Sequence, residues 1–181
     1  MKQTWSRRDV VKIGMAPLIV PAGVLGAKAP SERVRVGVIG VGRQTVQVNL
    51  KQFLAMPEVE VAAVCDVDAW RLENARRQVE EGSGKTGVKT FRNFRELLAD
   101  KSIDAVMVAT PDHWHVPVSM EAVRAGKDVS CEKPLTRCIG EGRALADLVK
   151  KHKRVFRTDS EYRSKAWYHQ AREAVINGRI G

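Results

Sequence analysis

The chain has 181 residues, which is enough for one domain with a sizeable core. Its content of 44% hydrophobic and 29% charged residues is ordinary for a globular protein, and the sequence contains no internal repeat or low-complexity run. The formal net charge is +10, but lysine and arginine are scattered along predicted helices rather than clustered. Solvated helix faces explain this charge, so no nucleic-acid partner is expected.

The cysteines give no sign of a disulfide framework or a metal site. There are three, Cys65, Cys131 and Cys138, and no two of them form a Cys-x-x-Cys pair. Cys65 and Cys131 fall at the ends of predicted strands, where a small buried thiol is the expected role.

The first 29 residues differ from the rest of the chain. The pair Arg7-Arg8 precedes an apolar run, and Ala27-Lys28-Ala29 has the small-x-small form of a cleavage site. The segment resembles a twin-arginine export signal, although Val10 stands where a phenylalanine is usual. We therefore expect residues 1–29 to direct export to the periplasm and residues 30–181 to form the domain. A basic tail on a cytoplasmic protein is the alternative.

The domain is predicted to begin with an apolar strand over Val34–Ile39 that ends in a Gly-x-Gly turn at Gly40 and Gly42. A helix is predicted over Gln44–Ala55. Such a turn places free backbone N–H groups at a helix N-terminus, where a pyrophosphate can bind. The third glycine of the dinucleotide fingerprint is replaced by Thr45, whose branched β-carbon is expected to push the helix outward or force local repacking. A tight strand-to-helix turn of any α/β domain is the alternative.

Apolar strands and amphipathic helices alternate along the rest of the chain. This alternation predicts an α/β domain with a doubly wound parallel sheet, in which the polar residues that end the strands share the carboxyl edge. Further strands are predicted over Val59–Val64, Val88–Phe91, Ala105–Ala109, Asp128–Cys131 and Val155–Arg157. The further helices are one capped by Asp68 and running to Glu81, a short one capped by Asn93, and those over His115–Ala125, Ile139–His152 and Ala166–Asn177.

Asp66 ends the second predicted strand. An acidic residue at this position can accept hydrogen bonds from the adenosine ribose hydroxyls of a dinucleotide, which favours NAD. Its charge would repel the 2′-phosphate of NADP unless Arg43 compensates. A helix-capping or turn aspartate is the alternative.

The run Thr110-Pro111-Asp112-His113-Trp114-His115 follows the fourth predicted strand. Its two histidines and one carboxylate are metal-ligand types, but no further cluster supports a metal, so none is expected. Its position favours a loop that lines a cofactor. A Pro-Asp turn followed by a helix start is the alternative.

Glu132-Lys133-Pro134 follows the fifth predicted strand. A lysine at a strand end in a cleft can act as a proton donor or acceptor. Glu132 beside it would orient a cofactor ribose or keep the lysine charged, and the peptide bond before Pro134 is a candidate for the cis form. A surface Glu-Lys-Pro turn is the alternative.

Five stretches stand in a fixed order along the chain: Gly37-Val38-Ile39-Gly40-Val41-Gly42-Arg43-Gln44, Cys65-Asp66-Val67-Asp68, Thr110-Pro111-Asp112-His113-Trp114-His115, Ala125-Gly126-Lys127-Asp128-Val129 and Cys131-Glu132-Lys133-Pro134-Leu135. Together they resemble the N-terminal half of the Gfo/Idh/MocA oxidoreductases, the family of glucose–fructose oxidoreductase and inositol dehydrogenase. The resemblance runs from about Arg33 to Gly181. It implies a Rossmann domain that binds NAD or NADP, and hydride transfer between the nicotinamide and a carbon of a sugar or polyol.

The resemblance also implies roles for particular residues. Asp66 would hold the adenosine ribose, Glu132 would contact the cofactor near its nicotinamide end, and Lys133 would assist proton transfer at the substrate hydroxyl. The pyrophosphate would be held by Gly40, Gly42, Arg43 and Gln44, and the path to the nicotinamide would be lined by Thr110, Pro111 and His115.

Members of the family have a C-terminal α/β domain that supplies much of the substrate pocket, and this sequence ends about where that domain would begin. Arg163 is a weaker candidate for a substrate contact. We expect the chain to be the NAD(P)-binding domain of such an oxidoreductase, inactive by itself and acting on a sugar-like substrate only with a C-terminal domain supplied. A truncated, non-catalytic remnant that at most binds a dinucleotide is the alternative. An uncovered sheet edge or helix face would promote self-association.

Overall fold

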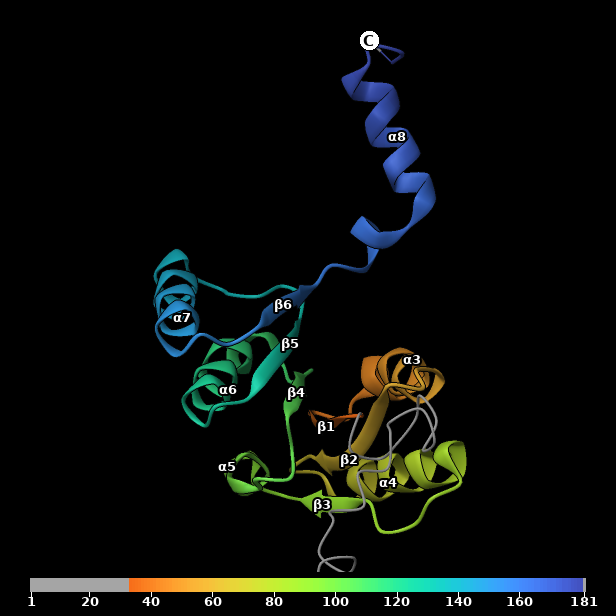
Figure 1. The fold of residues 1–181 in the computed structure, drawn as a ribbon, viewed down its shortest axis with the longest axis vertical. Coiled ribbons are helices and arrows are strands. Elements are labelled where there is room, and N and C mark those ends of the chain that lie inside the picture. The colour runs from red at the N-terminus through yellow and green to blue at the C-terminus, as the bar shows by residue number, and fades with distance from the viewer. Residues whose placement is uncertain (1–32, 181) are drawn as a thin grey trace, which may run out of the picture. The chain divides into compact units, whose positions relative to one another are not determined.

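The computed structural model describes residues 33–180, and the predicted signal segment, residues 1–29, lies outside the described part. Six strands form one sheet in the order β3-β2-β1-β4-β5-β6 (Figure 1), and every neighbouring pair is parallel. The strands are β1 (Val34–Ile39), β2 (Val59–Cys65), β3 (Lys89–Phe91), β4 (Ala105–Val108), β5 (Asp128–Glu132) and β6 (Phe156–Asp159). This confirms the predicted doubly wound parallel sheet. The strand order reverses between β1 and β4, which is the point where such sheets bind ligands.

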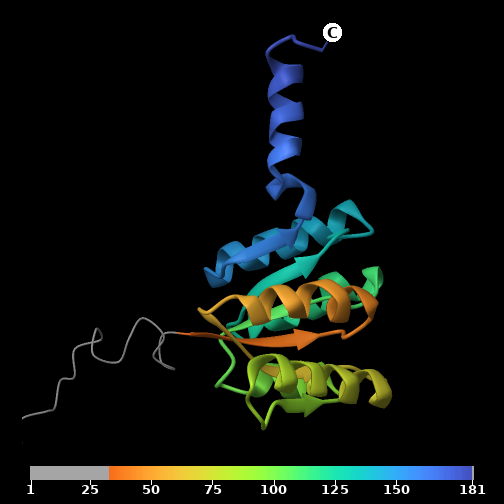
Figure 2. The same cartoon turned by 90° about the vertical axis from the view of Figure 1, so that its right-hand side faces the viewer.

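Helices cover both faces of the sheet, and each face has its own apolar core (Figure 1). On one face lie α3 (Leu50–Ala55), which runs alongside β1 in Figure 2, and α4 (Ala69–Ser83). The other face is covered by α5 (Phe94–Ala99), α6 (Asp112–Arg124) and α7 (Ile139–His152). The chain continues through the 3₁₀-helix η3 (Glu161–Ser164) into α8 (Ala166–Ile176), which has no buried residue. None of the helices within residues 33–180 is both long enough and apolar enough to cross a membrane.

The predicted helix caps are confirmed. Asp68 accepts hydrogen bonds from the backbone N–H groups of Trp70 (2.9 Å) and Arg71 (3.1 Å) at the start of α4. Asn93 accepts one from the N–H of Arg95 (3.0 Å) at the start of α5. Each cap satisfies donors that the helix itself cannot pair.

The central strand β1 distributes its side chains between the two cores. Val36 and Val38 pack with α3 and α4, and Ile39 packs into the opposite core. Gly37 lies against Leu97 of α5, and a β-carbon at Gly37 would come within 2.7 Å of Leu97 Cδ2. The absence of a side chain at Gly37 therefore provides the space that Leu97 occupies.

Several predicted boundaries are shifted by one to three residues, and two of the shifts concern the carboxyl edge of the sheet. Helix α6 begins at Asp112, three residues before the expected start at His115, because Pro111 acts as its N-cap and its carbonyl oxygen already accepts the N–H of Trp114 (2.8 Å). Strand β6 runs to Asp159 rather than ending at Arg157, because it stays paired with β5 as far as Glu132.

The structure divides the three cysteines into two buried thiols and one exposed thiol. Burial raises the pKa of Cys65 and that of Cys131 to about 12, so neither forms the reactive thiolate near pH 8. We expect an alkylating reagent to modify only Cys138 in the folded chain and all three thiols after unfolding, as counted by mass spectrometry. A Cys138→Ser variant should then be unreactive while folded. Rapid modification of a second thiol in the native chain would contradict the buried positions.

Candidate functional site

The glycine turn after β1 is held between the ends of the neighbouring strands. Gly40 has a φ of +88°, and its N–H donates to the carbonyl oxygen of Cys65 at the end of β2 (2.9 Å). On the other side, the N–H of Ala109 donates to the carbonyl oxygen of Ile39 (2.8 Å). A β-carbon at Gly40 would lie 2.6 Å from the carbonyl oxygen of Ala109. Backbone conformation and backbone contact thus both require glycine here.

Gly42 is different, because no atom of residues 33–180 presses against it. The nearest atom that a β-carbon would meet is Nη1 of Arg71, at 4.0 Å. Packing therefore does not explain this glycine. A ligand that approaches the backbone closely does explain it, and the turn leads directly into a helix whose first N–H groups have no partner within the helix.

The side chain of Thr45, which replaces the third glycine of the fingerprint, packs inside the fold. It is fully buried, and its hydroxyl donates to the carbonyl oxygen of Gly40 (2.7 Å). Thr45 begins a π-helical turn, η2 (Thr45–Asn49), in which the N–H of Leu50 bonds the carbonyl oxygen of Thr45. Nε2 of Gln78 in α4 donates to the carbonyl oxygen of Val46 in this widened turn (2.8 Å). Single π-helical turns occur often at functional sites.

A pocket of about 510 Å³ opens on one side of the glycine turn, at the ends of β1, β2 and β4. We call it the Asp66 pocket; four predicted residues line it, namely Gly40, Asp66, Thr110 and Pro111. The carboxylate of Asp66 accepts the N–H of Val41 (2.9 Å) and the N–H of Asp68 (3.0 Å), which fixes it beneath the turn. The buried hydroxyl oxygen of Thr110 has no hydrogen-bond partner within residues 33–180. Phe94 and Trp114 supply apolar lining, with their rings 6.3 Å apart.

A smaller pocket, of about 140 Å³, lies where β5 and β6 end. We call it the Glu132 pocket; it is mostly polar, and among its lining residues are Gln44, Asn49, Gln52, Glu132, Lys133, Asp159 and Tyr162. Glu132 is buried, and its carboxylate accepts hydrogen bonds from Nδ2 of Asn49 (3.0 Å) and from the N–H of Lys133 (3.2 Å). The peptide bond between Lys133 and Pro134 is cis, as the sequence suggested.

The two remaining residues of the predicted glycine loop, Gly42 and Arg43, line a third pocket of about 270 Å³ beside α4. We call it the Arg43 pocket. Arg71 lines it as well, so two arginines belong to the pocket that contains Gly42. Cations beside the start of a helix favour an anionic group there.

His115 does not line any of these three pockets, and its predicted place along the path to the nicotinamide stays a prediction. The ring is buried, its Nδ1 lies 2.7 Å from the carbonyl oxygen of Pro134, and its Nε2 lies 2.8 Å from the carbonyl oxygen of Thr110. Both ring nitrogens therefore face backbone carbonyl oxygens, and a neutral ring donates a hydrogen bond to one of the two. His115 lies inside α6 rather than at its start. Its ring connects the loop after β4 to the loop after β5.

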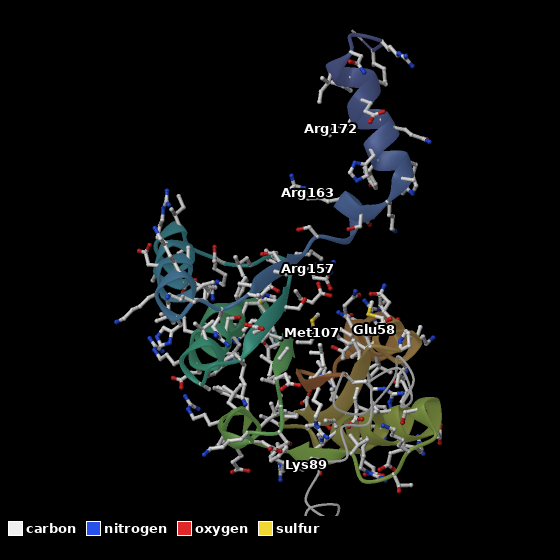
Figure 3. All side chains as sticks on the ribbon, in the orientation of Figure 1. Glu58, Lys89, Met107, Arg157, Arg163 and Arg172 are labelled. Carbon is white, nitrogen blue, oxygen red and sulfur yellow. The ribbon has the colours of Figure 1, made fainter. Side chains whose placement is uncertain are left out.

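Arg163 also lies outside the three pockets. It is an exposed residue of η3, between β6 and α8 (Figure 3). Its neighbour Tyr162 is the residue of this segment that lines the Glu132 pocket. In the part of the chain from residue 33 to residue 180, no three His, Cys, Asp or Glu side chains are grouped in a way that could hold a metal ion.

Asn49 is the residue of the site that sequence reasoning missed. It stands four residues after Thr45, and both are buried on the inner side of the widened turn. The available signal was a polar residue within the otherwise apolar inner face of a predicted helix. Its partner Glu132 is 83 residues away, so no local pattern connects the two.

The fold and the glycine turn define a Rossmann domain of the dinucleotide-binding class. Residues 34–160 match the family described as "Oxidoreductase family, NAD-binding Rossmann fold". The chain belongs to this family, Gfo/Idh/MocA, which confirms the resemblance drawn from the five motifs.

Individual relatives agree with this placement. A glycosyl hydrolase family 109 protein from Saccharopolyspora erythraea is 38% identical over 126 residues, 68% of this chain and 27% of that protein. A 3-ketoreductase from Actinomadura kijaniata, solved in complex with NADP and TDP-benzene, gives a TM-score of 0.73 at 26% identity, over 82% of this chain and 44% of the other. A scyllo-inositol dehydrogenase from Lactobacillus casei with bound NAD(H) and scyllo-inositol shares the fold, with a TM-score of 0.71 at 23% identity over 82% of this chain and 42% of the other. The chain thus spans less than half the length of each of these proteins.

Proposed function

We propose that the chain binds NAD along the carboxyl edge of its sheet, with the adenosine in the Asp66 pocket and the nicotinamide in the Glu132 pocket. The observation that carries this proposal is the position of the glycine turn at the strand-order reversal, with one pocket on each side of it. The pyrophosphate would lie over the open backbone of Gly42, beside Arg43.

Two buried oxygen atoms support this extended ligand. Oγ1 of Thr110 lies at the Asp66 pocket and Oδ1 of Asn49 at the Glu132 pocket, and neither has a hydrogen-bond partner within residues 33–180. Leaving a buried polar atom unpaired costs roughly 1–3 kcal/mol, so unpaired atoms at two pockets favour a polar ligand that reaches both.

We propose further that this domain serves hydride transfer on a sugar or polyol. Bound NAD would supply the hydride acceptor. Lys133, which lines the Glu132 pocket beside Glu132, would assist proton transfer at the substrate hydroxyl. Support comes from the family and from the inositol dehydrogenase and ketoreductase among the similar structures. Because the chain spans less than half of those proteins, it would contribute the cofactor side of such a site, with a non-catalytic dinucleotide-binding role as the alternative.

Cleavage of a glycosidic bond is a second candidate, because a relative of 38% identity is called a glycosyl hydrolase. The two candidates differ in their products. In an assay with a C-terminal domain supplied, formation of NADH from NAD and a free polyol would favour the dehydrogenase. Release of p-nitrophenol from a p-nitrophenyl glycoside in the presence of NAD would favour the hydrolase.

The choice between NAD and NADP depends on Asp66. A carboxylate beside the adenosine ribose repels a 2′-phosphate, so we expect calorimetric titration to show tighter binding of NAD than of NADP. Asp66→Asn should reduce this preference about tenfold, or about 1.4 kcal/mol, by removing the charge. Asp68→Asn is a matched control, because Asp68 is exposed, lines none of the three pockets and remains a good helix cap as asparagine. Equal binding of the two dinucleotides by the unaltered chain would show that Arg43 compensates for the charge of Asp66. It would contradict the role of Asp66 in the preference for NAD.

A further inference from the structure

Asn49 is a buried polar residue for which the proposed function has not yet named a ligand group. It ends the π-helical turn η2, its side chain is only 3% exposed, and it lines the Glu132 pocket. An asparagine in the interior of a helix has a low helix propensity, and burial removes its contacts with water. Its presence at this position therefore calls for a polar partner.

One end of the side chain has such a partner. Nδ2 donates to Oε1 of Glu132 at 3.0 Å, in a buried contact between the first helix and the end of β5. The orientation of the amide follows from this contact, because a carboxylate oxygen accepts hydrogen bonds and only the NH₂ side can donate one. Glu132 is held from its other side by the N–H of Lys133. Asn49 thus fixes a carboxylate that faces the same pocket.

The other end of the side chain has none within residues 33–180. Oδ1 of Asn49 is buried and accepts no hydrogen bond there. The amide cannot rotate to use water in place of Glu132 without breaking the contact that Nδ2 makes. The unpaired atom is consequently an acceptor whose direction is fixed by the contact of Nδ2 with Glu132, in a side chain that belongs to the lining of the pocket.

The pocket favours a small ligand group that donates hydrogen bonds. Its volume is about 140 Å³, and two carboxylates, those of Glu132 and Asp159, belong to its lining. It lies at the ends of β5 and β6, away from the Asp66 pocket at the ends of β1, β2 and β4. In a dinucleotide placed along this edge, the group that reaches it is the nicotinamide riboside.

We propose that Oδ1 of Asn49 accepts a hydrogen bond from the nicotinamide riboside half of the dinucleotide, while its Nδ2 keeps Glu132 in position. The donor is either the carboxamide NH₂ or a ribose hydroxyl. This inference rests on the proposed function, since it names the residue that recognises one half of the same ligand.

The test compares NAD with ADP, which lacks the nicotinamide riboside, in calorimetric titrations of the chain and its Asn49→Leu variant. Leucine is close to asparagine in volume and removes both polar ends. We expect the affinity for NAD to fall about tenfold, as for loss of a buried hydrogen bond, and the affinity for ADP to stay unchanged. Asn177→Leu, the same change at an exposed residue after α8, should alter neither.

A second measurement uses the unaltered chain, so it does not depend on the folding of the variant. We expect NAD to bind several-fold more tightly than ADP. The acetylpyridine analogue of NAD has a methyl group in place of the carboxamide NH₂. Weaker binding of this analogue than of NAD identifies the carboxamide as the donor, and equal binding identifies the ribose hydroxyl.

The outcomes separate this inference from the proposed function. Failure of the unaltered chain to bind ADP or NAD would overturn both. Binding of ADP with no gain for NAD would overturn the inference alone. Equal losses for NAD and ADP in Asn49→Leu would also overturn it, because they would show that Asn49 only maintains the fold.

Discussion

Replacing Gly40 by alanine is expected to destabilise the domain by roughly 2–5 kcal/mol and to abolish dinucleotide binding. Two effects add: alanine at a φ of +88° carries the strain of the left-handed region, and its methyl group would overlap the backbone at Ala109 and Thr110. Backbone atoms cannot rotate aside as a side chain can. The measurement is urea unfolding followed by circular dichroism, together with titration by NAD.

Gly42 provides the matched control for Gly40, since it lies two residues further along the same turn. Its φ is not positive, and a methyl group added there would have its nearest neighbour 4.0 Å away, so Gly42→Ala should leave stability within about 0.5 kcal/mol. Its affinity for NAD should nevertheless fall, because the methyl group would occupy the space assigned to the pyrophosphate. A Gly40→Ala variant as stable as Gly42→Ala would disprove the packing argument. Unchanged NAD binding by Gly42→Ala would show that the pyrophosphate lies elsewhere.

The second large effect is expected at His115. Replacing it by leucine would remove the hydrogen bond that the ring N–H donates to one of the two carbonyl oxygens, of Thr110 or Pro134, which should lower the free energy of unfolding by roughly 1–3 kcal/mol. Both carbonyls belong to loops at the carboxyl edge of the sheet, so affinity for NAD should fall as well. Urea unfolding and titration of the same sample separate the two effects.

His113 tests whether the loss is specific to the buried ring. It lies two residues earlier on α6 and is exposed, so His113→Leu should change stability by no more than about 0.5 kcal/mol. If the leucine variants at the two positions unfolded at the same urea concentration, the connection between the two loops would contribute nothing to stability.

The sequence predicted elements whose signals are local. Helix α7 was placed correctly over Ile139–His152 by its apolar periodicity, and β1 by its run of β-branched residues before Gly40. Asp68 and Asn93 were assigned as caps because a short polar side chain at a helix start has few other roles.

The features that the sequence did not reveal depend on contacts between distant residues. The π-helical turn at Thr45 accepts a hydrogen bond from Gln78, which lies 32 residues beyond its acceptor Val46. No pattern within the turn itself indicates a π-helix. The contact of the His115 ring with the carbonyl oxygen of Pro134 is another such feature, because the two residues are 19 positions apart. Placement at the carboxyl edge was predictable from topology, whereas the direction of each side chain was not.

The contact between Gly37 and Leu97 determines how β1 can sit in the sheet. Side chains alternate along a strand, so a slip by one residue would bring Val36 or Val38 to the place where Leu97 needs an empty position. The side chain of Leu97 fills the space that the missing side chain of Gly37 leaves. Their contact favours the register in which β1 ends beside the ends of β2 and β4, so the turn at Gly40 lies at the same edge as those ends. A residue in the middle of the strand, remote from any ligand, thereby aligns the edge on which the ligand would lie.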